Sequence, residues 1–151
     1  MSTLTIEVVT PEKAVLVGSA EEIILPGSEG QMGILPGHLP LLSGLGIGQM
    51  TVRGFKGEIG REQVSGERKF FVDGGFVEVL PDKVTVMTEA CDGYDEIDVN
   101  AAKAAIEEAE RELLAMEERA KSEEVEGEVL ERHQEALKRA RMRLLMHEEG
   151  E

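Results

Sequence analysis

The chain has 151 residues and a formal net charge of −15 at pH 7, and 41% of its residues are hydrophobic. These values predict one folded domain or two small ones, with an aliphatic core, since only 3% of residues are aromatic and tryptophan is absent. The negative charge argues against nucleic acid and anionic membrane surfaces as partners, because both are bound through Lys and Arg.

The start of the chain and its single cysteine give expectations about its compartment. The first residues, MSTLTIEVVTPEKAV, lack a charged segment followed by an apolar one, so we expect no signal peptide. No apolar run approaches the roughly 20 residues that a transmembrane helix needs. Cys91 is the only cysteine, which excludes an internal disulfide and favours a reducing compartment. We expect Cys91 to be buried at the end of a strand.

Residues 1–92 have the pattern of an all-β unit. They contain 14 of the 17 glycines and all five prolines, and apolar residues alternate with polar ones, as at Leu4, Ile6 and Val8. Many short strands at regular spacing indicate a β-sandwich or barrel. The predicted strands cover residues 4–8, 14–18, 21–25, 31–35, 49–55, 68–80 and 83–89.

Turn signals separate these strands. They lie at Pro26-Gly27, Pro36-Gly37, Asp73-Gly74-Gly75 and Pro81-Asp82. The segments GSEGQMG and GLGIG lack the lysine and the following helix of a phosphate-binding loop. Gly44, Gly46 and Gly48 are therefore interpreted as a further turn or bulge.

Residues 93–151 contain no proline and nine alanines, and they predict two helices. The first lies within residues 97–121, with Asp98 as its N-cap, and the second within residues 128–149. A short connection makes them an antiparallel hairpin. The stripe of the first helix is mostly alanine, which buries little apolar area, so the hairpin must lean on another surface. The two stripes are Ala102, Ala105, Ile106, Ala109, Leu113, Met116 and Ala120, and then Leu130, His133, Leu137, Ala140 and Leu144.

No set of residues has the spacing of a catalytic or metal site. His38, His133 and His147 are far apart in the sequence, and none has a neighbour at metal-ligand spacing. The G-x-S-x-G motif of serine hydrolases is absent. We therefore predict neither a catalytic residue nor a metal ligand.

A group of basic residues near the end of the second predicted helix has two readings. Lys138, Arg139, Arg141 and Arg143 are four cations within six positions of an acidic chain. They could form a solvated face that is favoured by the negative end of the helix dipole. They could also form a docking patch for an acidic partner or a phosphate group, and the residues alone leave both readings open.

Four segments, in order, resemble the epsilon subunit of bacterial-type F-type ATP synthases. GSEGQMGILPGHLPLLSGLGIG is similar to the signature loop of that family, with the pattern G-x-x-G-I-x-P-x-H-x-P-L-L. FFVDGGFVEVLPDKVTVMTEAC resembles a later hairpin. EIDVNAAKAAIEEAE and ALKRARMRL resemble the two C-terminal helices. The resemblance covers nearly the whole chain.

The resemblance implies an α+β fold in which a ten-stranded β-sandwich (1–92) precedes an antiparallel two-helix hairpin (93–151). It implies a non-catalytic rotor subunit of the proton-translocating ATP synthase, bound to the gamma subunit and the c-ring. The hairpin would inhibit ATP hydrolysis at the alpha and beta subunits. The location implied is peripheral, on the cytoplasmic side of the plasma membrane, without direct membrane insertion.

The resemblance also assigns residues. Glu29, Gln31 and His38 correspond to the face toward the c-ring, in a loop whose glycines and prolines set turns while its Leu and Ile alternate into the core. Lys138, Arg139, Arg141 and Arg143 would dock to beta.

A regulatory ATP site is also implied, at Asp98, Arg139 and Arg143. Family members that bind ATP carry Asp-x-x-Arg-Ala at the start of the first helix, and here Ala101 stands in the place of the arginine. Losing one guanidinium removes about 1.5–3 kcal/mol of contacts, so ATP is expected to be at most a weak regulatory ligand and not a cofactor. Without ATP, Asp98 is a plain N-cap.

The alternative function is a free-standing acidic β-sandwich adaptor with a helical protein-docking tail. Such an adaptor would need neither rotor nor membrane, whereas the rotor subunit requires gamma as a stoichiometric partner. An enzyme ranks third, because no catalytic constellation is present.

Overall fold

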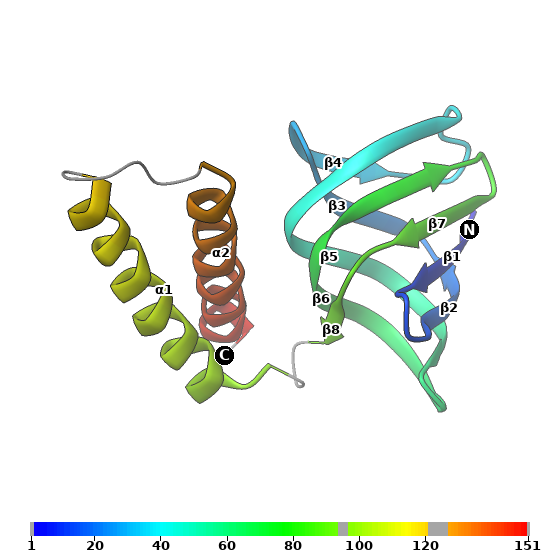
Figure 1. Ribbon diagram of the computed structural model, residues 1–151. Helices are drawn as coiled ribbons and strands as arrows, with labels where there is room; N and C mark the ends of the chain where they lie inside the picture. The colour runs from blue at the N-terminus through cyan, green and yellow to red at the C-terminus, as the bar shows by residue number, and fades with distance from the viewer. Residues whose placement is uncertain (1, 94–96, 121–126, 151) are drawn as a thin grey trace. The chain divides into compact units, whose positions relative to one another are not determined.

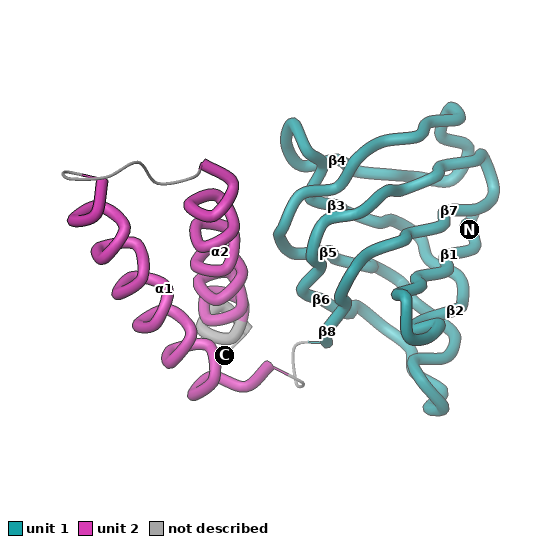
Figure 2. Tube along the Cα trace, viewed as in Figure 1, with its two compact units in different colours: residues 1–95 teal, residues 96–151 magenta. Residues whose placement is uncertain are grey.

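A computed structural model describes residues 2–93, 97–120 and 127–150, with no side-chain description for residues 147–150. The chain divides into two compact units, Met1–Asp95 and Glu96–Glu151 (Figure 2). The described strands all lie in the first unit and both described helices lie in the second (Figure 1). Each unit is described by itself.

Eight strands make up the described part of the first unit. Two of them, β5 and β6, are far longer than the rest, with 19 and 18 residues. The strands are β1 (Leu4–Val9), β2 (Ala14–Ala20), β3 (Glu22–Gly27), β4 (Gly30–Ile34), β5 (Leu41–Ile59), β6 (Glu62–Val79), β7 (Lys83–Met87) and β8 (Cys91–Gly93).

The strands form a sandwich that is closed by its longest pair. The order is β4-β3-β5-β2-β1-β7-β6-β8, and β5 also pairs with β6, which joins the two halves of the order (Figure 1). All described pairings are antiparallel except that of β1 with β7. The strand count is eight and not the expected ten, because β5 and β6 each run through both layers as one bent strand.

Alternating side chains supply the core between the layers. Leu4, Ile6 and Val8 of β1 are almost fully buried, as the sequence pattern predicts. Phe55 and Phe70 are the largest side chains in this core, which is otherwise aliphatic. Cys91 is buried at the start of the last strand, which confirms its predicted environment.

One predicted turn is wrong, because its glycines serve a bend inside a strand. Asp73-Gly74-Gly75 lies within β6, at the point where that strand changes its partner from β8 to β7. Gly74 and Gly75 have φ values of 66° and 106°, a backbone region that favours glycine. The bend is held by Thr88, whose hydroxyl accepts a hydrogen bond from the Asp73 N–H at 3.1 Å and donates one to the Ala90 carbonyl at 3.2 Å.

Gly44, Gly46 and Gly48 lie within a strand, β5. Of the two predicted alternatives, the irregular pairing confirms a bulge for Gly46 and Gly48, and not a turn. The neighbouring strand β3 comes close there, and its register with β5 shifts between Ile24 and Gly27. A Cβ atom at position 48 would lie 2.7 Å from Cβ of Pro26. The absence of a side chain at Gly48 therefore allows the close approach of β3, whereas a Cβ at Gly44 or Gly46 would lie 3.5 Å from the nearest atom, an ordinary contact.

The second unit is a hairpin of α1 (Val99–Ala120) and α2 (Gly127–Gly150) (Figure 1). The Asp98 carboxylate accepts a hydrogen bond from the Ala101 N–H at 3.0 Å, which confirms Asp98 as the N-cap. The predicted α1 stripe is right in part, since Ala102, Ala109 and Met116 are buried. Ala105 and Ala120 are exposed, so the buried seam is narrower than predicted. The expected connection at residues 121–126 lies outside the described residues.

Gly75 and Gly66 provide a test of the bend in β6. Their φ values are similar, 106° and 99°, but a Cβ at Gly75 would overlap the Met87 carbonyl, whereas the nearest atom at Gly66 is 3.9 Å away. Gly66→Ala should lower the free energy of unfolding by the backbone strain alone, about 1–3 kcal/mol. Gly75→Ala adds a clash between backbones and should lower it by more than about 4 kcal/mol. Urea unfolding of the full chain, followed by circular dichroism, measures both, and equal losses would contradict the role of Gly75.

Candidate functional site

The residues that were predicted to form one rim lie in the edge strand β4 and in the segments directly before and after it. Glu29 lies in the turn before β4, Gln31 lies in β4, and His38 lies in the loop that follows. Glu29 and Gln31 are exposed, and His38 is half-buried. β4 pairs only with β3 among the described strands, so its other edge is open (Figure 1). The three residues therefore flank an open edge and do not share one loop.

The loop of residues 35–40 is fixed by hydrogen bonds. The Gly37 N–H donates to the Pro81 carbonyl at 2.8 Å, and the His38 N–H donates to the Leu35 carbonyl at 3.1 Å. The His38 Nδ1 atom lies 2.7 Å from the Leu39 carbonyl oxygen, which can only accept. This contact therefore requires a proton on Nδ1 and leaves Nε2 as the acceptor of a neutral ring.

Apolar side chains around this loop are exposed, although the loop was predicted to send its Leu and Ile residues into the core. Ile34 and Leu45 are buried as expected, but Leu39 is 79% exposed and Leu42 is 69% exposed. Leu41 and Leu42 are consecutive in β5, so they cannot both point inward. We call the exposed set the apolar rim. It consists of Leu35, Leu39, Leu41, Leu42, Phe76 and Leu80.

The register of the strands places two members of the apolar rim on one side of the β5–β6 pair. Leu41 and Leu42 pair with Val79 and Glu78, and Gly44 pairs with Phe76. Because side chains two residues apart share a face, Leu42 and Phe76 lie on the same outward side of the β5–β6 pair. Exposed apolar side chains that gather on one side mark interaction sites in soluble proteins, and here the exposed Glu78 lies among them, opposite Leu42. The signal for these exposed side chains in the sequence is the Leu41-Leu42 pair, because two consecutive leucines in a strand point to opposite sides.

The four basic residues of α2 do not form a single face. Lys138 and Arg141 lie about 60° apart around the helix, and Arg139 and Arg143 about 40° apart. The two pairs are separated by about 100–160°. A flat partner surface can therefore contact one pair fully but not all four residues at once.

Acidic side chains of the hairpin pair with part of this basic group. Arg141 Nη2 donates to Glu110 Oε1 of α1 at 3.0 Å, with the two side chains 58% and 50% exposed. Arg139 Nη2 lies 3.5 Å from Glu135 Oε2, one turn earlier in α2. The basic group is thus partly neutralised within its own unit.

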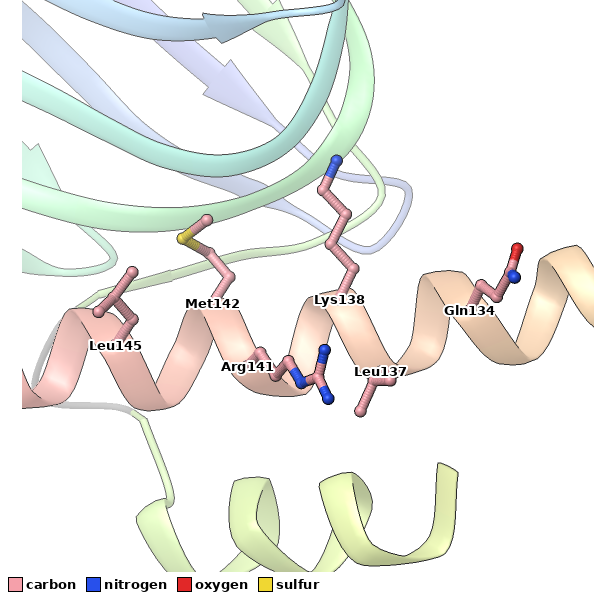
Figure 3. Close-up of a pocket in the computed structure, with 6 residues that line it drawn as sticks. All are labelled: Gln134, Leu137, Lys138, Arg141, Met142 and Leu145. Carbon is pink, nitrogen blue, oxygen red and sulfur yellow. The ribbon is translucent and has the colours of Figure 1, made fainter. Parts of the chain in front are cut away.

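A shallow hollow of about 230 Å³ follows the α2 face that carries Lys138 and Arg141. In Figure 3 Lys138 and Met142 project from one side of the helix, whereas Leu137 and Arg141 point toward α1. Cations and apolar side chains therefore alternate along this stretch of helix. The hollow is lined by Gln134, Leu137, Lys138, Arg141, Met142 and Leu145.

The residues of the implied ATP site are not brought together. In the antiparallel hairpin, the contact of Glu110 with Arg141 shows that these two residues lie at the same level along the two helices. Asp98 then lies about 15–20 Å along the helix axis from Arg139 and Arg143. Asp98 already accepts the Ala101 N–H, so the structure gives it the role of a cap.

Two other features, a metal site and a membrane-spanning helix, are absent from the described residues. There, no group of three or more His, Cys, Asp or Glu side chains is placed to hold a metal ion. Neither described helix contains a stretch that is long and apolar enough to cross a bilayer.

Comparison with known proteins identifies the family. Residues 3–92 match the family described as ATP synthase, Delta/Epsilon chain, beta-sandwich domain. The ATP synthase epsilon chain of Syntrophobacter fumaroxidans is 40% identical over 145 residues, which are 96% of each chain. That of Solibacter usitatus is 41% identical over 113 residues, 74% of this chain and 77% of the relative.

The fold also matches a solved structure. A chain of the Euglena gracilis mitochondrial ATP synthase (OSCP/F1/c-ring in rotational state 1) aligns with a TM-score of 0.68, covering 93% of this chain and 79% of that one. The sequence identity is 23%, so this match concerns the fold alone. Together with the family match over the sandwich and the 40% identity along nearly the whole length, it leads to one conclusion: the chain belongs to the ATP synthase epsilon chain family.

Proposed function

We propose that the protein is a non-catalytic central-stalk subunit of a proton-translocating F-type ATP synthase, which couples the catalytic head to the c-ring. The observation that carries this proposal is the 40% identity to an ATP synthase epsilon chain along 96% of both chains. A similar fold occurs in a mitochondrial central stalk and c-ring assembly of Tetrahymena thermophila, with a TM-score of 0.50. The subunit would be peripheral, on the cytoplasmic side of the membrane.

The first unit would provide the binding surface for the gamma subunit and the c-ring. The apolar rim supports this role, because leucines such as Leu39 and Leu42 are exposed beside a loop that is fixed by hydrogen bonds. Burying one such side chain in an interface contributes about 1.5–3 kcal/mol. Glu29, Gln31 and His38 flank β4 and would supply polar contacts to the loops of the c subunits.

The second unit would inhibit ATP hydrolysis. Helix α2 has 24 residues, so it would reach about 36 Å when extended away from the sandwich. Lys138 and Arg141, on the face with Met142 and Leu145, would then dock to acidic segments of beta. Arg139 and Arg143 point to the other side of the helix, so they would contact a different surface of the alpha and beta subunits.

Cysteine crosslinking tests the proposed c-ring contact. Gln31→Cys and His38→Cys should each crosslink to the polar loop of c in the assembled enzyme, because both flank the open edge of β4. Glu62→Cys, in an exposed position at the start of β6, is the control and should give no such product. Native Cys91 is 7% exposed and should not compete. Crosslinks from positions 31 and 38 to alpha or beta alone would contradict the proposed orientation.

Removing the inhibitory helix tests the regulatory role. Deletion of residues 128–151 should raise the rate of ATP hydrolysis by the assembled enzyme while leaving assembly intact. Replacing Lys138, Arg139, Arg141 and Arg143 by Glu should have the same direction, because acidic partners would then be repelled. Steady-state hydrolysis assays with equal amounts of purified complex measure both. If neither variant changes hydrolysis, the basic residues are a solvated face of the helix and the inhibitory role is wrong.

A further inference from the structure

We propose that Glu110 of α1 is a latch that sets how readily the hairpin releases its inhibitory helix, because it competes with the docking partner for Arg141. The contact between the Glu110 carboxylate and the Arg141 guanidinium carries this inference. It rests on the proposed inhibitory function, and it adds to that function an internal competitor for one of the docking cations.

Arg141 belongs to two surfaces of α2 at once. It follows Ala140, which is 2% exposed, and it points toward α1, where Glu110 Oε1 lies 3.0 Å from its Nη2. It also lines the hollow with Lys138, Met142 and Leu145. The same guanidinium therefore cannot serve the hairpin and an external carboxylate fully at the same time.

The acidic surroundings in α1 make this competition effective. Glu107, Glu108, Glu110 and Glu112 are all exposed and lie within six positions of the helix. Glu110 is the one for which an ion pair to α2 is resolved. Glu112 is two residues further on and points about 200° away around the helix, so it offers a control of equal charge on another face.

The exchange of partners keeps the two states close in free energy. When the hairpin opens, Arg141 loses one exposed carboxylate, and when it docks it gains another. Release therefore does not leave an unpaired cation in either end state. The α1 side of the seam loses modest apolar burial, because Ala102 and Ala109 are two of its three buried residues and Met116 is the third. A two-state element with a small difference in free energy is what a regulatory switch requires.

The expected effect of the latch is modest. Measured energies of exposed ion pairs correspond to a change of about 1.4- to fivefold in an equilibrium constant. Glu110→Gln should shift the opening of the hairpin by this factor. Glu110→Lys should shift it further, because it places two cations together.

Two readouts test the proposal. Hydrogen exchange of the isolated full chain should be faster in α2 for E110Q than for E112Q, and faster for E110K than for E112K. In the assembled enzyme, E110Q and E110K should hydrolyse ATP more slowly than the Glu112 controls, because the released helix inhibits more often. The charge-swapped E110K/R141E should recover slow exchange and should hydrolyse ATP at least as fast as the unaltered enzyme, because the hairpin is held again and one docking cation is lost.

The outcomes separate the latch from the proposed function. Equal exchange in the Glu110 and Glu112 variants would overturn the latch, whatever hydrolysis does. Slower hydrolysis in every Glu-to-Gln variant alike would also overturn it, since net charge would then be the cause. A third outcome is faster exchange in E110Q together with unchanged hydrolysis when residues 128–151 are deleted. That result would show that Glu110 stabilises the hairpin, and it would overturn the proposal that the second helix inhibits hydrolysis.

Discussion

The pairing of β5 with β6 is the interaction on which the rest of the first unit depends. Their register runs from Leu41 with Val79 to Ile59 with Glu62, broken only by a shift between Val52 and Phe55. This pair joins the two halves of the strand order and closes the sandwich. It also dictates which side chains leave the core, because the period of two turns Leu42 and Phe76 outward once Val77 and Val79 are buried. The outward direction of Leu42 and Phe76 is therefore a consequence of how the sandwich closes, whereas Leu35 and Leu39 belong to the loop before β5.

Much of the architecture could be predicted from the sequence, because it depends on local patterns. Alternation at Leu4, Ile6 and Val8 predicted a strand, and the spacing of alanines after Asp98 predicted a capped helix. The continuity of β5 and β6 could not be predicted in this way. Glycines such as Gly75 and Gly48 look like turn residues in the sequence, whereas in the structure they allow a bend or a close approach. Only the neighbouring strands decide between these uses.

The candidate surfaces were predicted less well than the fold. Glu29, Gln31 and His38 were expected to share one rim, and they lie before, within and after β4, so their common contact with the c-ring stays a prediction. Leucines of the same segment were assigned to the core on hydrophobicity alone, although consecutive leucines in a strand must point to opposite sides. The cations of α2 were found by composition, but their division into two faces follows from helix geometry, and the contact of Arg141 with Glu110 depends on how two helices pack.

Both units thus have features that are typical of binding surfaces. The first unit exposes the apolar rim to solvent, and in the second unit the ion pair of Arg141 can be replaced by one with another protein. We expect other subunits to cover the apolar rim. The most direct test is purification of the tagged full chain from its native membrane, with Leu39→Ser/Leu42→Ser as the comparison. We expect the unaltered chain to purify with stoichiometric gamma and c subunits. We expect the double variant to lose both partners, although its own thermal unfolding temperature is the same as that of the unaltered chain. Recovery of the unaltered chain alone, or equal recovery of partners by both chains, would contradict this expectation.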